Sequence, residues 1–86
     1  MQPSPLAGLR ILIVEDEMLV SLLLKDMLGD LGCLVVGPAC SVDEALSMIE
    51  AHGLDGAVLD VNLSGQMSYP VADTLAARAV PFIFST

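Results

Sequence analysis

The chain has 86 residues, which is enough for one domain with one hydrophobic core. Hydrophobic residues make up 55% of it and aromatic residues only 3%, so the core must be aliphatic, which suits a parallel sheet covered by helices. Eleven acidic residues against three basic ones give a net charge of −8, which argues against a nucleic-acid or anionic-membrane surface in this segment.

Residues 1–8 are expected to form a flexible lead that carries no export signal, because they contain two prolines and no basic residue. The apolar run at 9–14 is too short to cross a bilayer. Cytoplasmic residence is therefore the expectation, with no membrane as partner. Cys33 and Cys40 are too few for a disulfide framework and are expected to be free thiols.

The chain continues as short apolar runs that alternate with amphipathic stretches. Residues 9–14 predict a strand that is buried on both faces apart from Arg10. Residues 16–31 predict a helix, and Gly32 stands where that helix would stop. The expected core-facing stripe of this helix consists of Val20, Leu23, Leu24, Met27, Leu28 and Leu31.

A second strand and a second helix are expected in the next segment. The strand covers residues 34–37 and is ended by Pro38. Ser41 and Glu44 then form an S-x-x-E capping box ahead of an apolar stretch, which predicts that a helix starts there. This helix is expected to end near residues 52–53.

The last third of the sequence repeats the alternation. We expect a third strand at 56–60, a loop rich in Ser and Gly at 62–68, a third helix at 69–79 and a fourth strand at 81–86. Strict alternation of strands and helices implies parallel pairing with right-handed crossovers. The sequence therefore predicts the α/β class.

Three carboxylates stand at the carboxyl ends of the predicted strands. Glu15 and Asp16 follow the first strand directly, and Asp60 closes the third. Ligands of open α/β sheets bind beyond the carboxyl ends of the strands, so these acids converge if the two strands are neighbours. Like charges repel, and the cluster therefore favours a cation, with Mg²⁺ the natural candidate, or shared protons. Each acid taken alone is better explained as a helix cap or a turn residue, and only the set of three favours a shared site.

Three blocks of sequence carry a resemblance to a known family. The blocks are ILIVEDE at 11–17, AVLDVNL at 57–63 and VPFIFST at 80–86. In their order and spacing they resemble the receiver domain of two-component response regulators. The resemblance covers residues 9–86, which would form one receiver domain, and it implies a flavodoxin-like open parallel sheet with strand order 2-1-3-4.

The resemblance also implies roles for single residues. Asp60 matches the phosphoacceptor, a nucleophile that takes a phosphoryl group from a histidine kinase or a histidine phosphotransfer protein. Glu15 and Asp16 match the acidic pair that holds Mg²⁺ together with Asp60. Asn62 matches the position whose backbone carbonyl completes the metal shell, and Thr86 matches the switch hydroxyl that bonds the phosphoryl group. Such a chain would be a signalling domain and not an enzyme.

The sequence departs from the family pattern at its carboxyl end. The family has a fourth helix, a fifth strand with a lysine that pairs with the phosphoryl group, and a fifth helix. Here the only lysine is Lys25, in the first predicted helix. The alternative function is therefore a receiver-like interaction or oligomerisation module that is not efficiently phosphorylated. An aspartate-nucleophile phosphatase is disfavoured, because Asp60 ends the third strand and not the first.

The first predicted helix carries a second apolar patch, formed by Met18, Leu19 and Leu22. In the family the first helix also packs against the fifth, and without that partner the patch would face water. The fourth strand would likewise be an open edge of the sheet. We therefore expect self-association through the first helix or through the fourth-strand edge.

Overall fold

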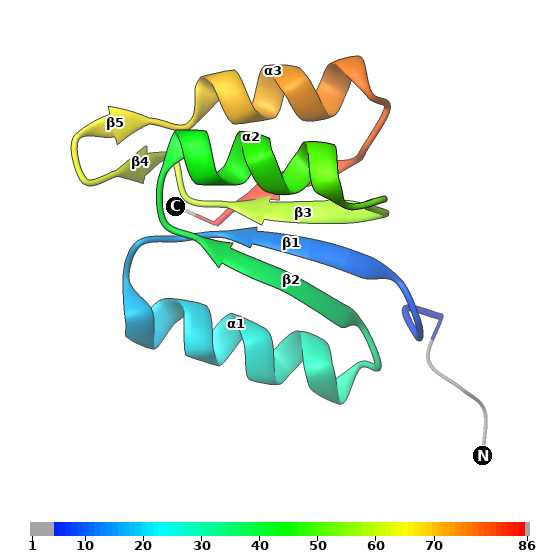
Figure 1. Cartoon of the computed structure of the whole chain (residues 1–86). Helices are drawn as coiled ribbons and strands as arrows, with labels where there is room; N and C mark the ends of the chain where they lie inside the picture. Colours follow the sequence, from blue (N-terminus) through cyan, green and yellow to red (C-terminus); the bar gives the residue numbers. More distant parts are fainter. Residues whose placement is uncertain (1–4, 86) are drawn as a thin grey trace.

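Four parallel strands form the centre of the molecule in a computed structural model that describes residues 5–85 (Figure 1). They are β1 (Arg10–Val14), β2 (Leu34–Ala39), β3 (Gly56–Leu59) and β6 (Phe82–Phe84). Their order is β2-β1-β3-β6, with every pairing parallel. This is the order 2-1-3-4 that the resemblance implied, and it confirms the open α/β sheet.

Helices cover both faces of this sheet (Figure 1). α1 (Met18–Asp30) lies on one face, and α2 (Val42–Ala51) and α3 (Tyr69–Ala77) pack against each other on the other face. The Ser41 hydroxyl caps α2 as predicted, because it accepts the backbone N–H of Glu44 at 3.1 Å. A fifth parallel strand and further helices do not occur in the part of the chain that the structure describes, in agreement with the sequence.

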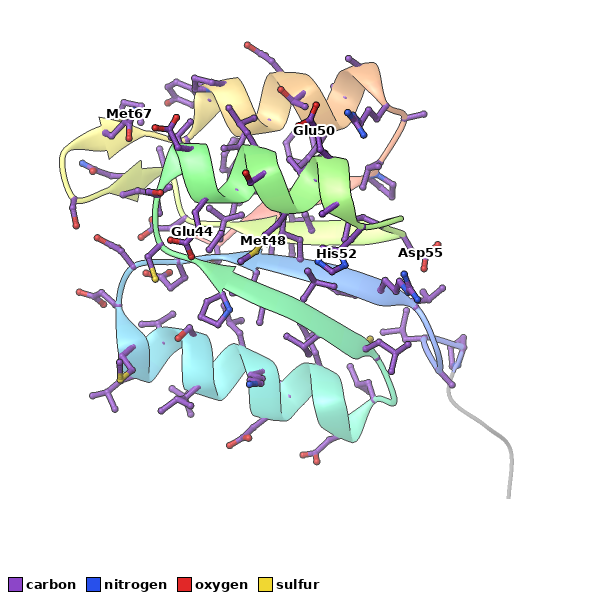
Figure 2. All side chains as sticks on the ribbon, in the orientation of Figure 1. Glu44, Met48, Glu50, His52, Asp55 and Met67 are labelled. Atoms are coloured by element: carbon purple, nitrogen blue, oxygen red, sulfur yellow. The ribbon has the colours of Figure 1, made fainter. Side chains whose placement is uncertain are left out.

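The segment expected to be a loop contains a short antiparallel hairpin. β4 (Asn62–Leu63) pairs with β5 (Gln66–Met67) around the turn residues Ser64 and Gly65, which have φ angles of 52° and 90°. Positive φ at both turn positions matches the twist of two paired strands. The hairpin projects from one end of the molecule (Figure 1), and the exposed Met67 is labelled on it in Figure 2.

The two faces of the sheet are packed very differently. The main core lies on the side of α2 and α3, and its large, fully buried members include Leu12, Val14, Ile49, Leu59, Val71 and Leu75. On α1, by contrast, the only buried residue is Ser21. Each fully buried aliphatic side chain contributes about 1.5–3 kcal/mol. Most of the hydrophobic stabilisation therefore comes from the α2 and α3 side.

The stripe predicted on α1 is only partly correct. Val20, Leu24 and Leu28 are half-buried, as expected for residues that face the sheet. Leu23, Met27 and Leu31, which belonged to the same predicted stripe, are 64%, 62% and 43% exposed. The reason is that the main contacts of α1 are with β1 and β2, so a narrow strip of its surface is covered.

Residues 5–8 form a turn against the connection between α1 and β2. The Gly8 N–H donates to the Gly32 carbonyl at 2.9 Å, and the Cys33 thiol donates to the Leu6 carbonyl at 3.6 Å. Residues 1–4 of the predicted lead lie outside the described part of the chain. Cys33 and Cys40 are free thiols, as expected. Within residues 5–85, every helix is too short or too polar to cross a membrane.

Candidate functional site

Three carboxylates meet at the carboxyl ends of β1 and β3. One oxygen each from Glu15, Asp16 and Asp60 lies within 4.8 Å of the other two. The two strands are parallel neighbours with Val14 opposite Leu59, so the residues that follow them leave the sheet at the same edge. The Asp60 N–H also donates to the Val14 carbonyl at 2.8 Å, which fixes the two strand ends together. The predicted convergence of the three acids is confirmed.

Glu15 is the buried member of this cluster, with 4% of its surface exposed. Desolvation by burial raises its pKa above the usual range, and the charge of Asp60 and a hydrogen bond shared with Asp60 raise it further. The charge of Asp16 acts in the same direction. The Glu17 backbone N–H, 3.0 Å from Oε1, opposes this rise because it stabilises the charged form. A bound cation or a proton would relieve the repulsion among the three carboxylates.

The β4–β5 hairpin reaches two members of the cluster. The Ser64 hydroxyl donates a hydrogen bond to the Asp16 carboxylate. At the hairpin base, the fully buried Ser68 donates its hydroxyl to the backbone carbonyl of Asp60 at 2.5 Å. Sequence reasoning missed both serines. The available signal was a run of small polar residues directly after the strand that carries Asp60.

Asn62 uses its side chain inside the hairpin, where its Oδ1 accepts the Gly65 N–H at 2.7 Å. This agrees with the idea that only its backbone matters at the metal, although that role stays a prediction. Thr86 lies outside the described residues. Its neighbour Ser85 donates its N–H to the Leu59 carbonyl at 2.7 Å, which carries the end of β6 to the same edge of the sheet.

The donors in the cluster fit a hard divalent cation. All three are carboxylate oxygens, the ligand type that Mg²⁺ prefers, and Mg²⁺ commonly keeps several waters beside one or two carboxylates. Asp16 and Asp60 are half-buried, so solvent has access to both carboxylates. Histidine and cysteine, the ligands typical of zinc, are absent from the cluster. In the chain from residue 5 to 85, no second group of three such side chains converges.

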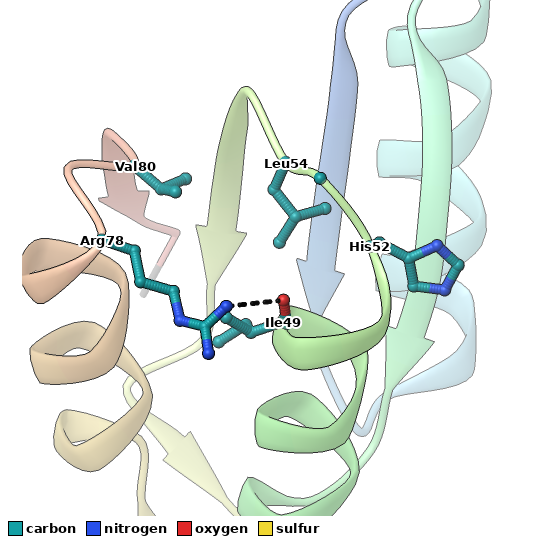
Figure 3. Close-up of a pocket in the computed structure, with 6 residues that line it drawn as sticks. Ile49, His52, Leu54, Arg78 and Val80 are labelled. Atoms are coloured by element: carbon teal, nitrogen blue, oxygen red, sulfur yellow. Dashed lines mark hydrogen bonds between the residues drawn. The ribbon is translucent and has the colours of Figure 1, made fainter.

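A pocket of about 400 Å³ lies at the opposite end of the sheet and does not belong to this site (Figure 3). Leu54 and Val80 line it, and they precede β3 and β6, whereas the acids follow β1 and β3. The Arg78 guanidinium donates to the Ile49 carbonyl at 3.4 Å, so it satisfies a carbonyl near the end of α2. The His52 ring points away from Arg78 in Figure 3. We assign this arginine a structural role.

Comparison with known proteins identifies the family of the chain. The model of the response regulator receiver domain matches residues 11–86. The transcriptional regulatory protein PdtaR of Mycobacterium tuberculosis is 32% identical over 71 residues, which cover 83% of this chain and 35% of PdtaR. The chain thus spans about a third of the length of the curated relatives it matches.

Solved structures agree with this match. SdrG from Sphingomonas melonis Fr1 is 49% identical with a TM-score of 0.84, over 90% of this chain and 66% of SdrG. The response regulator PhyR from Brucella abortus is 31% identical with a TM-score of 0.86, over 94% of this chain and 34% of PhyR. The solved PhyR structure is that of a response regulator. The chain belongs to the response regulator receiver domain family.

Proposed function

We propose that the chain is the phosphoacceptor of a two-component phosphorelay. The observation that carries the proposal is the convergence of Glu15, Asp16 and Asp60 within 4.8 Å, in a chain of the receiver family. In the proposed step, an Asp60 carboxylate oxygen attacks the phosphorus of a phosphohistidine on a histidine kinase or histidine phosphotransfer protein. A P–O bond forms while the P–N bond breaks, and the imidazole nitrogen leaves with the bonding electron pair.

The surrounding residues would hold Mg²⁺ and position the phosphoryl group. Asp16 and Asp60 are the proposed direct ligands, with Glu15 acting through water and the backbone carbonyl of Asn62 completing the set. When bound, the cation offsets negative charge on the transferring phosphoryl oxygens. The Thr86 hydroxyl is proposed to bond the phosphoryl group after transfer. We further propose that residues 9–86 act as one receiver domain in the cytoplasm.

The exposed side of α1 supports a role in protein binding. Large apolar side chains crowd its solvent-facing surface, namely Met18, Leu19, Leu22, Leu23 and Met27. Met18 and Leu19 are 76% and 77% exposed, and contiguous apolar patches of this kind commonly mark interaction sites. We propose that copies of the chain self-associate through this patch or through the free edge of β6.

A second candidate function, a protein-interaction module without efficient phosphorylation, has support of its own. The solved structure of PhyR from Bartonella quintana, 26% identical with a TM-score of 0.83, shows that protein complexed with the anti-sigma factor NepR. By analogy, a partner other than a kinase would suit this chain. Lys25, the one lysine among the 86 residues, is exposed on α1.

Phosphoryl uptake separates the two functions. The protein is incubated with acetyl phosphate and Mg²⁺, and intact mass spectrometry measures the fraction that carries one phosphoryl group. We expect uptake by the wild type, none by Asp60→Asn, and normal uptake by Asp73→Asn, a matched change at an exposed aspartate on α3. If the wild type takes up no phosphoryl group and binds no beryllofluoride with Mg²⁺, the phosphoacceptor proposal is wrong and the interaction module stands.

A further inference from the structure

We infer that Ser64 is a positioning residue for Asp16, and that the β4–β5 hairpin thereby sets the affinity of the acidic cluster for a divalent cation. The direct observation is the hydrogen bond from the Ser64 hydroxyl to Oδ2 of Asp16, between residues 48 positions apart in the sequence. The inference rests on the proposed function, because it takes Asp16 to be a ligand of Mg²⁺.

The base of the hairpin is fixed to the strand that carries the phosphoacceptor. Ser68, with no exposed surface, donates its hydroxyl to the Asp60 carbonyl at 2.5 Å and its N–H to the Val61 carbonyl at 2.8 Å. Leu63 on β4 is 3% exposed and belongs to the main core. Buried anchors on β4 and directly after β5 restrain the hairpin more than an open loop of equal length. The position of its tip is therefore set by the backbone around Asp60.

The turn then directs one side chain toward the cluster. Gly65 donates its N–H to Oδ1 of Asn62 at 2.7 Å, which closes the two-residue turn. Ser64 has a φ of 52°, in the left-handed region where Gly, Asn and Asp are favoured over other residues. Serine is not the residue that the backbone alone would favour here. Its hydroxyl, donated to a charged acceptor, compensates for that local cost.

The chemical consequence concerns the two oxygens of the Asp16 carboxylate. Ser64 binds Oδ2, and among residues 5–85 no hydrogen bond reaches Oδ1, so the carboxylate is held in one orientation with Oδ1 open to a cation. Asp16 is only half-buried, and without this contact its side chain would exchange between rotamers in water. Hydrogen bonds that orient a metal-binding side chain typically change metal affinity by about 10–100-fold when they are removed.

Calorimetric titration with Mg²⁺ alone tests the inference on the intact chain. We expect Ser64→Ala to bind Mg²⁺ about tenfold more weakly than the wild type. Alanine and serine face the same cost at positive φ, so this change removes the hydroxyl without altering the backbone preference. Ser64→Asn should bind nearly as well as the wild type, because asparagine tolerates this φ and its amide supplies a donor. Ser47→Ala, at an exposed serine of α2, is the matched control and should bind normally.

A second measurement tests whether the β4–β5 hairpin responds when Mg²⁺ binds to the acidic cluster. In the wild type, the amide resonance of Gly65 at the hairpin tip should shift on Mg²⁺ addition, and in Ser64→Ala this shift should largely disappear. The role of Ser64 is overturned if the wild type binds Mg²⁺ and Ser64→Ala binds it with an affinity within twofold of the wild type. It is also overturned if Ser64→Asn binds Mg²⁺ as weakly as Ser64→Ala does. Either result leaves the proposed function intact. A wild type that binds no Mg²⁺ overturns both.

Discussion

Removing the buried charge of the acidic cluster should stabilise the metal-free protein. Glu15→Gln keeps the shape of the side chain and the Oε1 acceptor for the Glu17 N–H. Two unit charges 4.8 Å apart, the separation within which the cluster oxygens lie, repel by about 1 kcal/mol in water and by about 3 kcal/mol at an effective dielectric of 20. We expect the free energy of unfolding at pH 7 to rise by about 1–3 kcal/mol, because Glu15 is almost fully buried.

The pH dependence of this gain follows from the raised pKa of Glu15. The folded protein binds this proton more tightly than the unfolded chain does, so the group favours folding at low pH, and that contribution is lost as the pH rises. The advantage of Glu15→Gln should therefore be largest near neutral pH, shrink as the pH falls through the raised pKa of Glu15, and be gone below the usual carboxyl value of 4.5.

Thermal unfolding followed by circular dichroism in EDTA, from pH 4 to 8, measures the effect. For a domain of this size, each 1 kcal/mol corresponds to about 4–8 °C in Tm. Glu50→Gln, at the exposed glutamate of α2 labelled in Figure 2, is the matched control and should change stability by less than about 0.5 kcal/mol. A Glu15→Gln protein less stable than the wild type at pH 7, or a gain that does not diminish in acid, would refute the reasoning.

Three other predictions use the same protein. Mg²⁺ at about a hundred times its Kd should stabilise the wild type by about 2.7 kcal/mol, and Asp16→Asn should lose most of that shift in a calorimetric melt; equal shifts would remove Asp16 from the metal site. Ser68→Ala should lower the urea-derived free energy of unfolding by about 1–3 kcal/mol, since it leaves the Asp60 carbonyl without its donor; an unchanged midpoint would show that this bond is replaceable. Leu19→Lys should weaken self-association in analytical ultracentrifugation while Tm changes little, because Leu19 is 77% exposed; an unaltered sedimentation profile would exclude the α1 patch.

Much of the fold was predictable because it depends on local patterns. Apolar runs of four to six residues marked the strands, and the Ser41 cap marked the start of α2. The acidic cluster was predictable for a related reason: parallel strands bring their carboxyl ends to one edge, so Glu15, Asp16 and Asp60 had to meet once β1 and β3 were neighbours.

The parts that sequence reasoning missed depend on long-range contacts. The strands of the hairpin are two residues each and have no periodicity to detect, and the bond between Ser64 and Asp16 joins distant positions. The buried face of α1 was misjudged because leucine and methionine occur nearly all round that helix, so the pattern does not select one face. Leu23 and Met27 stay exposed because the part of the sheet that α1 covers is narrow, which only the structure shows.

The unequal packing of the two sheet faces has a consequence for local unfolding. Few side chains of α1 are buried against the sheet, so α1 should unfold locally while α2 and α3 stay packed. The backbone amides of α1 should therefore exchange with deuterium sooner than those of α2. α1 begins at Met18, two residues after Asp16, and loosening of its first turn would carry that carboxylate with it. A protein that binds α1 and restrains it would therefore also restrain the carboxylate of Asp16, which precedes the helix.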